Sequence, residues 1–254
     1  MTISPERANR FTWRRQHLLE RAAVGEALGV AKDICGLHAQ ISTVPALTLW
    51  ARVAELEREQ IDQMLYGNRS LIKVRSMRGT LHLLPTEDLS IYWRVVMGYQ
   101  LEEWRRWLKR TGRLRPRQER ERLYRLLLEA LAEGPLTRSE LSARFPQFVP
   151  ESGASWGVDL KELCYLGKLC HARPQGAEAR FARLDRWLPG VNLEAIGLAT
   201  AQRRLVLSYL RGFGPATVQD FSHWAGFRVG DARPIFEAAA EELAELKIEG
   251  LKGP

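Results

Sequence analysis

Apolar residues recur at helical spacing through most of residues 11–66. Trp13, Leu18 and Ala22 belong to the first of these stripes, and Gly67-Asn68 ends the last one. Apolar side chains three and four positions apart lie on one face of an α-helix. The pattern therefore predicts four helices, at residues 11–23, 27–37, 45–56 and 57–66.

A change to β-rich sequence follows in residues 70–75 and 80–84. These two runs flank Met77-Arg78-Gly79, which supplies the turn of a predicted hairpin. Helices followed by a hairpin are the arrangement of a winged helix-turn-helix. We assign residues 1–98 to a first such unit, with Arg78 and Gly79 at or near the tip of its wing.

A second unit with the same order is predicted over residues 119–188. Gly134-Pro135 separates its first two helices, and Thr137 with Glu140 has the spacing of a capping box. The predicted elements are helices at 119–132, 136–141 and 158–166 and strands at 169–173 and 179–184. A long amphipathic helix at 86–110 precedes this unit, and residues 99–118 form a basic helix and linker.

The last part of the chain repeats the sequence Gly-Pro-x-Thr before a helix. Gly214-Pro215-Ala216-Thr217 matches Gly134-Pro135-Leu136-Thr137, which indicates an internal repeat. We therefore assign residues 189–254 to a third winged helix, whose wing is incomplete at residues 247–254. The predicted fold class is mainly α with small β-hairpins, organised as tandem winged helix-turn-helix units.

Composition narrows the function. The chain carries 38 basic and 30 acidic residues, a net charge of +8, which favours a polyanionic partner such as a nucleic acid. The sequence contains neither an apolar run of membrane-spanning length nor an apolar signal-peptide core, and its three cysteines suit a reducing compartment. These features predict a cytoplasmic protein without a membrane partner.

Few chemical motifs are present. Cys164, Cys170 and His171 match no zinc-ligand spacing, and we interpret them as core thiols beside a strand histidine. The sequence contains no P-loop, GxGxxG, GxSxG or HExxH motif and no telling pair of carboxylates. We therefore predict neither a metal ion nor a cofactor.

One polar pair lies among apolar neighbours. His38 and Gln40 stand between Leu37, Ala39 and Ile41. In an extended segment residues two apart point to the same side, whereas on a helix they point about 200° apart. Two interpretations remain: the pair satisfies backbone groups at a helix-end junction, or both side chains open into one basic concavity and act on one small target.

The most basic stretch is residues 104–117, which contains seven Arg or Lys and no acidic residue. It is either a solvated linker or a band that binds DNA phosphates. Under the second interpretation, replacing Arg105, Arg106 and Arg110 weakens binding to all DNA sequences alike. The arginines predicted to contact DNA are Arg52, Arg75, Arg78, Arg105, Arg106, Arg110 and Arg113.

Several widely spaced pieces resemble the winged-helix DNA glycosylase family that includes the AlkZ-type crosslink-repair enzymes. The resemblance spans most of the chain. The matching pieces are Gly36-Leu37-His38-Ala39-Gln40, Leu49-Trp50-Ala51-Arg52, Met77-Arg78-Gly79-Thr80-Leu81-His82, and residues 209–217 with Asp220-Phe221 and Trp224.

The resemblance implies that His38 and Gln40 are catalytic. Family members commonly carry Gln-x-Gln at this place, so His38 departs from that form, and they generally continue into a further β-rich portion. The implied reaction is hydrolysis of the N-glycosidic bond of alkylated, N7-type cationic purines in DNA, including crosslink adducts, by a monofunctional, monomeric enzyme acting on double-stranded DNA. His38 would add weak general-base character, and Gln40 would orient the water or contact the deoxyribose. For His82 we favour a cross-strand structural role.

Two other functional classes remain as alternatives. Winged helices occur more often in transcriptional regulators than in enzymes, and a non-catalytic DNA-binding protein would use His38 and Gln40 only structurally. An RNA-binding adaptor fits less well, because the aromatic residues occupy predicted helix-core positions.

Overall fold

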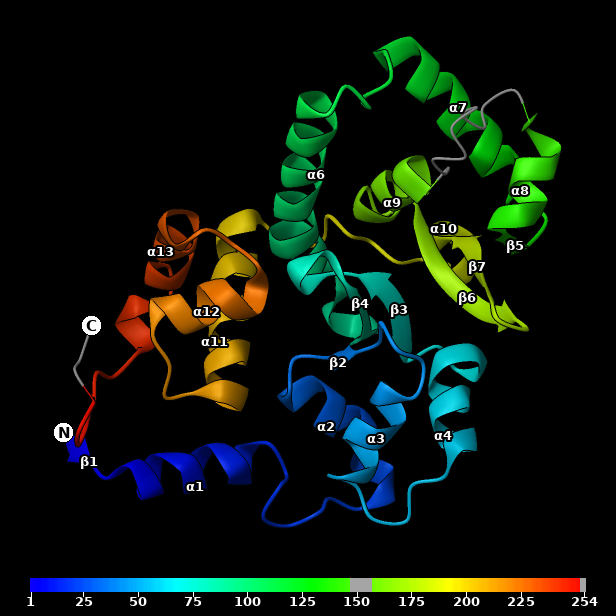
Figure 1. Ribbon diagram of the computed structural model, residues 1–254. Coiled ribbons are helices and arrows are strands. Elements are labelled where there is room, and N and C mark those ends of the chain that lie inside the picture. Colours follow the sequence, from blue (N-terminus) through cyan, green and yellow to red (C-terminus); the bar gives the residue numbers. More distant parts are fainter. Residues whose placement is uncertain (147–156, 252–254) are drawn as a thin grey trace.

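The structure, a computed structural model, describes residues 1–146 and 157–251. It is mainly helical with a small sheet (Figure 1). Helices α11 to α13 gather at one side of the molecule and α7 to α9 at the other, with β3 and β4 between them (Figure 1). The predicted class, mainly α with short strands, is therefore confirmed.

The helices of the N-terminal region are shorter than their apolar patterns predict. Helix α1 begins after the N-cap Ser4 and ends at Arg15, and His17 follows with a φ of 55°. Helix α2 ends at Asp33 because Cys35 and Gly36 adopt φ values of 59° and 90°, which no α-helix accommodates. The helices are α1 Pro5–Arg15, α2 Ala27–Asp33, α3 Val44–Trp50 and α4 Arg58–Asp62, with a π-turn at Gln63–Gly67.

The predicted hairpin at residues 70–84 is confirmed. Strands β3 Leu71–Arg75 and β4 Leu81–Pro85 pair antiparallel around a short turn at Met77–Gly79. Beyond β4 the chain forms one nearly continuous helical run. It comprises Thr86–Asp88, α5 Leu89–Tyr92, a π-turn at Trp93–Met97, and α6 Gly98–Arg110.

The following region also has the predicted order. Thr137 accepts a hydrogen bond from the Glu140 amide, and the Glu140 carboxylate accepts one from the Thr137 amide, so the capping box is formed. The elements are α7 Arg117–Ala130, β5 Leu136–Thr137, α8 Arg138–Arg144, α9 Gly157–Tyr165, β6 Leu169–Gln175, β7 Glu178–Arg183 and α10 Leu184–Trp187.

The C-terminal helices are α11 Leu198–Phe213, α12 Val218–Ala225 and α13 Val229–Glu237. Thr217, in the repeated Gly-Pro-x-Thr sequence, caps α12, and Gly226 ends this helix with a φ of 79°. Instead of pairing within a third hairpin, β8 Lys247–Ile248 pairs in parallel with β1 Thr2–Ile3. Residues 252–254 of the predicted third wing lie outside the described residues.

Both hairpins belong to one six-stranded sheet, in the order β2-β4-β3-β6-β7-β5. Strand β3 joins β6 where Lys73 pairs with His171. Two of the three apolar clusters are local, one within residues 22–83 and one within residues 123–169. The third combines residues of β3, β4, α5, β6 and β7 with α11 to α13, so the C-terminal helices share their core with the centre of the molecule.

No helix among the described residues is long and apolar enough to cross a membrane. The three cysteines are all buried and carry free thiols. Cys164 on α9 and Cys170 on β6 lie in apolar clusters. This arrangement agrees with their interpretation as core thiols.

His171 on β6 is a buried histidine. Its side chain is enclosed beside Phe181, and neither ring nitrogen has a hydrogen-bond partner among the described residues. Burial, with smaller contributions from Arg75 and Lys73, lowers the pKa of His171 from 6.5 to about 3. The imidazole is therefore neutral in the folded protein at pH values where the unfolded chain begins to protonate it.

We predict that His171 makes the fold sensitive to acid. Its contribution to stability is present above pH 6.5 and is lost as the pH falls toward 3, because only the unfolded chain gains the proton. His171→Phe should remove this dependence. Urea unfolding at pH 7 and at about pH 4.5 should show the variant gaining about 2–3 kcal/mol relative to the wild type between the two conditions. If the difference in unfolding free energy between the variant and the wild type is the same at both pH values, His171 is not the source of the acid sensitivity.

Candidate active site

The polar pair lies on and just beyond a short strand that the helical pattern does not predict: His38 is its last residue, and Gln40 follows two residues later. Strand β2 comprises Leu37–His38 and runs antiparallel to β4. Gly36 precedes it with a φ of 90°, and a Cβ there would lie 2.5 Å from Leu84 Cδ2 and 2.8 Å from the Leu83 carbonyl oxygen. Only glycine allows both this conformation and this close approach, so Gly36 fixes how β2 meets β4.

The register of β2 decides where the candidate residues point. Leu37 pairs with Leu83 and His38 with His82, and the Ala39 amide donates to the Leu81 carbonyl at 2.7 Å. Leu37 and Ala39 are buried, whereas His38 is half-buried and Gln40 is exposed. This alternation is the period of an extended chain, so His38 and Gln40 share the side opposite the apolar residues.

His38 and Gln40 are more exposed than their apolar sequence neighbours suggest. Neither member of the pair is fully buried, although their neighbours are apolar. The polar residue buried at this place is instead His82. Alternation along residues 37–40 sends Leu37 and Ala39 into the core and leaves His38 and Gln40 accessible to a ligand, while Ile41 beyond them is exposed.

Gln40 is held by the adjacent strand. Its side-chain Oε1 accepts a hydrogen bond from the Leu81 amide at 3.3 Å. The oxygen of the amide group therefore faces β4, and the Nε2 donor is directed elsewhere. This contact gives the exposed side chain a defined orientation.

His38 contacts the buried His82 across the strands. Their ring centroids lie 5.4 Å apart at an interplanar angle of 81°, an edge-to-face arrangement. His82 is only 3% exposed, and its Nδ1 lies 3.2 Å from the Thr80 carbonyl oxygen. Burial, opposed by that hydrogen bond and reinforced by Arg78 and His38, lowers the pKa of His82 to about 4.

The hairpin turn beside these histidines is pressed against α12. Arg78 adopts a φ of 54°, and its guanidinium donates to the Trp224 carbonyl at 2.6 Å. A Cβ on Gly226 would lie 2.7 Å from the Arg78 Cα. Arg78 thus lies at the predicted turn, but the turn packs on a C-terminal helix rather than projecting as a free wing tip.

Besides Arg78, two more of the arginines predicted to contact DNA donate to the protein's own backbone. Arg52 is half-buried and donates to the Thr48 carbonyl at 2.9 Å, and desolvation lowers its pKa. Arg75 donates to the Gly79 carbonyl at 3.1 Å and supports the hairpin turn. Both side chains stabilise local structure.

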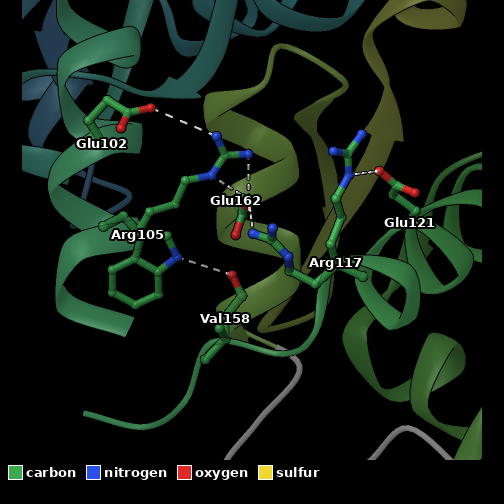
Figure 2. A network of polar contacts seen from close by, with 8 residues as sticks. Glu102, Arg105, Arg117, Glu121, Val158 and Glu162 are labelled. Carbon is green, nitrogen blue, oxygen red and sulfur yellow. Dashed lines mark hydrogen bonds and ion pairs between the residues drawn. The ribbon is translucent and has the colours of Figure 1, made fainter. Parts of the chain in front are cut away.

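Arg105 belongs to an ion-pair network around a buried carboxylate. The Glu162 side chain is 1% exposed and accepts from Arg105 Nε at 2.9 Å and from Arg120 Nη1 at 3.1 Å. Figure 2 shows Arg105 reaching from α6 to Glu162 on α9, with Glu102 on its other side and the separate pair Arg117–Glu121 nearby. Arg105 therefore ties α6 to α9, because removing it would leave a buried charge short of a partner.

The other arginines of the basic stretch are more accessible. Arg106 pairs with Glu103 at 2.8 Å at the surface of α6. Arg113 lies over the Trp107 ring, 5.4 Å from its centroid. Arg110 is exposed and has no hydrogen bond or ion pair among the described residues. Of the predicted DNA contacts in this stretch, Arg110 and Arg113 are the ones without an acidic partner there.

The tryptophans of the same stretch pack on the protein. Trp104 and Trp107 stack with ring centroids 4.8 Å apart. Lys161 Nζ lies 3.8 Å from the centroid of Trp104, and the Trp104 indole donates to the Val158 carbonyl (Figure 2). These contacts match the interpretation of the tryptophans as packed residues.

The profile of the family described as DNA glycosylase AlkZ-like matches residues 31–253. The chain belongs to the AlkZ-like DNA glycosylase family. This membership confirms the prediction of a DNA glycosylase, an enzyme of DNA repair, over that of a regulator.

A curated relative and a solved structure agree. The interstrand DNA cross-link repair glycosylase of Streptomyces sahachiroi is 30% identical over 259 residues, which cover 95% of this chain and 67% of that protein. The structure of the Streptomyces sahachiroi DNA glycosylase AlkZ superposes with a TM-score of 0.82 at 27% identity, covering 99% of this chain and 69% of that one. The chain thus spans about two thirds of the length of each.

Two features of the site escaped the sequence argument. The short strand β2 was assigned to the end of a helix, and the contact between His38 and His82 was not foreseen. A signal for the strand exists in Cys35-Gly36, since a glycine before alternating apolar and polar residues is typical of a turn into a strand. The 44-residue separation of the two histidines hid their pairing.

Proposed function

We propose that this DNA glycosylase hydrolyses the N-glycosidic bond of alkylated, N7-type cationic purines in double-stranded DNA. His38 and Gln40 are its catalytic residues, and the enzyme is monofunctional, with water as the nucleophile. The observation that carries the proposal is the extended, alternating segment that turns both side chains to one accessible side, with Gln40 oriented by the Leu81 amide.

The chemistry of the substrate suits this pair. Alkylation at N7 makes the purine cationic and hence a good leaving group. The enzyme then needs to position water and stabilise the positive charge that develops on the sugar. A neutral imidazole at His38 accepts a proton from the attacking water, and Gln40 contacts that water or the deoxyribose.

The cationic leaving group removes the need for a strong general acid in the site. A neutral purine needs protonation before it departs, whereas a cationic purine leaves without it. Glutamine and histidine side chains are sufficient for this task, because they hold water without adding a permanent charge. Selectivity for cationic adducts is therefore part of the proposal.

DNA binding is assigned to the surface arginines that have no acidic partner. Arg110 and Arg113 are exposed at the end of α6. Arg106 is exposed but pairs with Glu103, and the exposed Arg78 is bound to the Trp224 carbonyl. Arg52, Arg75 and Arg105 support the fold instead, because their guanidinium groups are bound to carbonyls or to Glu162. The positive charge that contacts phosphates is thus a subset of the predicted set.

The proposal also covers the domain organisation of the chain and its crosslinked substrates. The regions 1–98 and 119–188 serve as tandem winged-helix units around the linker 99–118, whereas residues 189–251 contribute helices without a hairpin of their own, since β8 pairs with β1. The protein acts as a monomer in the cytoplasm. The Streptomyces sahachiroi relative repairs interstrand cross-links according to its name. We extend the proposed substrates to crosslinked purines on this basis.

The catalytic assignment predicts a selective loss of excision. His38→Ala and Gln40→Ala should each lower the single-turnover excision rate on DNA carrying N7-methylguanine by about 10²-fold, the typical effect of losing one positioned group. The double variant should lose less than the product of the two effects, since both groups act on one water. Affinity for undamaged duplex and thermal stability should remain unchanged.

Ser42→Ala is the matched control for this series. Ser42 is exposed two residues after Gln40, so its substitution tests the effect of altering the loop alone. It should excise at the wild-type rate. Equal losses of stability, DNA affinity and excision in His38→Ala and Gln40→Ala would indicate a structural role and contradict the assignment.

The division of the arginines predicts opposite phenotypes for two residues of α6. Arg110→Gln should reduce the slope of log K against log salt by about 0.9, the value of one phosphate contact, without changing stability. Arg105→Gln removes the same charge but should leave the slope unchanged and lower the free energy of unfolding by about 1–3 kcal/mol, because Glu162 loses a partner. Salt titrations of duplex binding and urea unfolding measure both. The reverse pattern would overturn the division.

A further inference from the structure

We propose that His82 is a positioning residue for the reaction: its ring holds the His38 imidazole in the orientation that serves the attacking water. This inference rests on the proposed function, because it assigns a task to the neighbour of a proposed catalytic residue. His82 belongs to the Met77–His82 segment, whose histidine was interpreted as purely structural. The contacts of its ring carry the new assignment.

The strand register brings the two rings as close as a sheet allows. In an antiparallel pair, hydrogen-bonded and non-hydrogen-bonded positions alternate. The Ala39 amide donates to the Leu81 carbonyl, so the neighbouring pair His38–His82 occupies a non-hydrogen-bonded position, where side chains are closest. Their edge-to-face contact at 5.4 Å follows directly from this register.

The His82 ring is fixed on its other sides as well. On β3, the residue paired with His82 is Val74, whose side chain is buried. The Thr80 carbonyl can only accept a hydrogen bond, so the Nδ1 that lies 3.2 Å away must carry the proton. His82 is thereby held in one tautomer, with Nε2 left as an acceptor.

The charge state of His82 suits a site that forms a sugar cation. Burial, Arg78 and His38 together lower its pKa to about 4, against the hydrogen bond to Thr80. A protonated imidazole here would repel both a cationic purine and the developing charge on the sugar. A ring that stays neutral at physiological pH can support His38 without this penalty.

Two substitutions separate the positioning role from a role in folding. In His82→Asn the amide nitrogen takes the place of Nδ1 and keeps the hydrogen bond to Thr80, but the ring that contacts His38 is lost. In His82→Gln the amide group reaches the place of Nε2 instead. The first retains the local backbone contact, and the second retains a polar group toward His38.

The experiment is a double-mutant cycle on single-turnover excision of N7-methylguanine. His82→Asn should slow excision about tenfold when His38 is present and less than twofold in the His38→Ala background. His82→Gln should recover part of the rate. Affinity for the duplex should stay at the wild-type value. Equal losses in both backgrounds, or no loss in either, would overturn the inference.

A second readout does not depend on activity. The ¹⁵N resonances of the His38 ring, assigned by their disappearance in His38→Ala, should shift in His82→Asn and return toward the wild-type position in His82→Gln. Unchanged His38 resonances in His82→Asn would contradict the contact. If the wild type excises no N7-alkylpurine but these shifts occur, the proposed substrate fails while the positioning contact stands.

Discussion

The close approach of β2 to β4 is the constraint on which the site depends. Gly36 allows it, because any side chain there would collide with Leu83 and Leu84. Once the two strands pair, the register places His38 against His82 and brings Gln40 to the Leu81 amide. A local backbone requirement at one glycine thus determines the geometry of three side chains that come from distant parts of the sequence.

A second constraint governs how the positive charge is used. Glu162 is buried between α6, α7 and α9 and needs cationic partners, which Arg105 and Arg120 supply. Arg52 and Arg75 are likewise bound to backbone carbonyls. The net charge of +8 is therefore a poor guide to which arginines face DNA, since part of that charge holds helices and turns together.

The sequence was most informative where local rules decide the structure. The capping box at Thr137 and both hairpins were predicted, because caps and turns depend on residues close in sequence. The pairing of β8 with β1 could not be predicted, since it joins strands from opposite ends of the chain. The union of both hairpins in one sheet comes from the pairing of β3 with β6, where Lys73 lies opposite His171, and no periodicity encodes that pairing.

The same distinction holds for the site. The spacing of His38 and Gln40 predicted a shared side once an extended backbone was assumed, and the burial alternation of residues 37–40 agrees with it. The role of each arginine could not be predicted, because Arg105 and Arg110 lie on one helix in the same basic run yet differ in whether a buried carboxylate is within reach. Such differences arise from tertiary packing alone.

The central claim is that this chain releases cationic purines from DNA. Its most direct test is an assay of the wild-type protein on a duplex with one N7-methylguanine, scoring abasic sites and the released base. The account predicts an abasic site at the lesion, free N7-methylguanine in equal amount, and no strand cleavage before alkaline treatment, as expected of a monofunctional enzyme. Protein that binds this duplex but releases no base would contradict it.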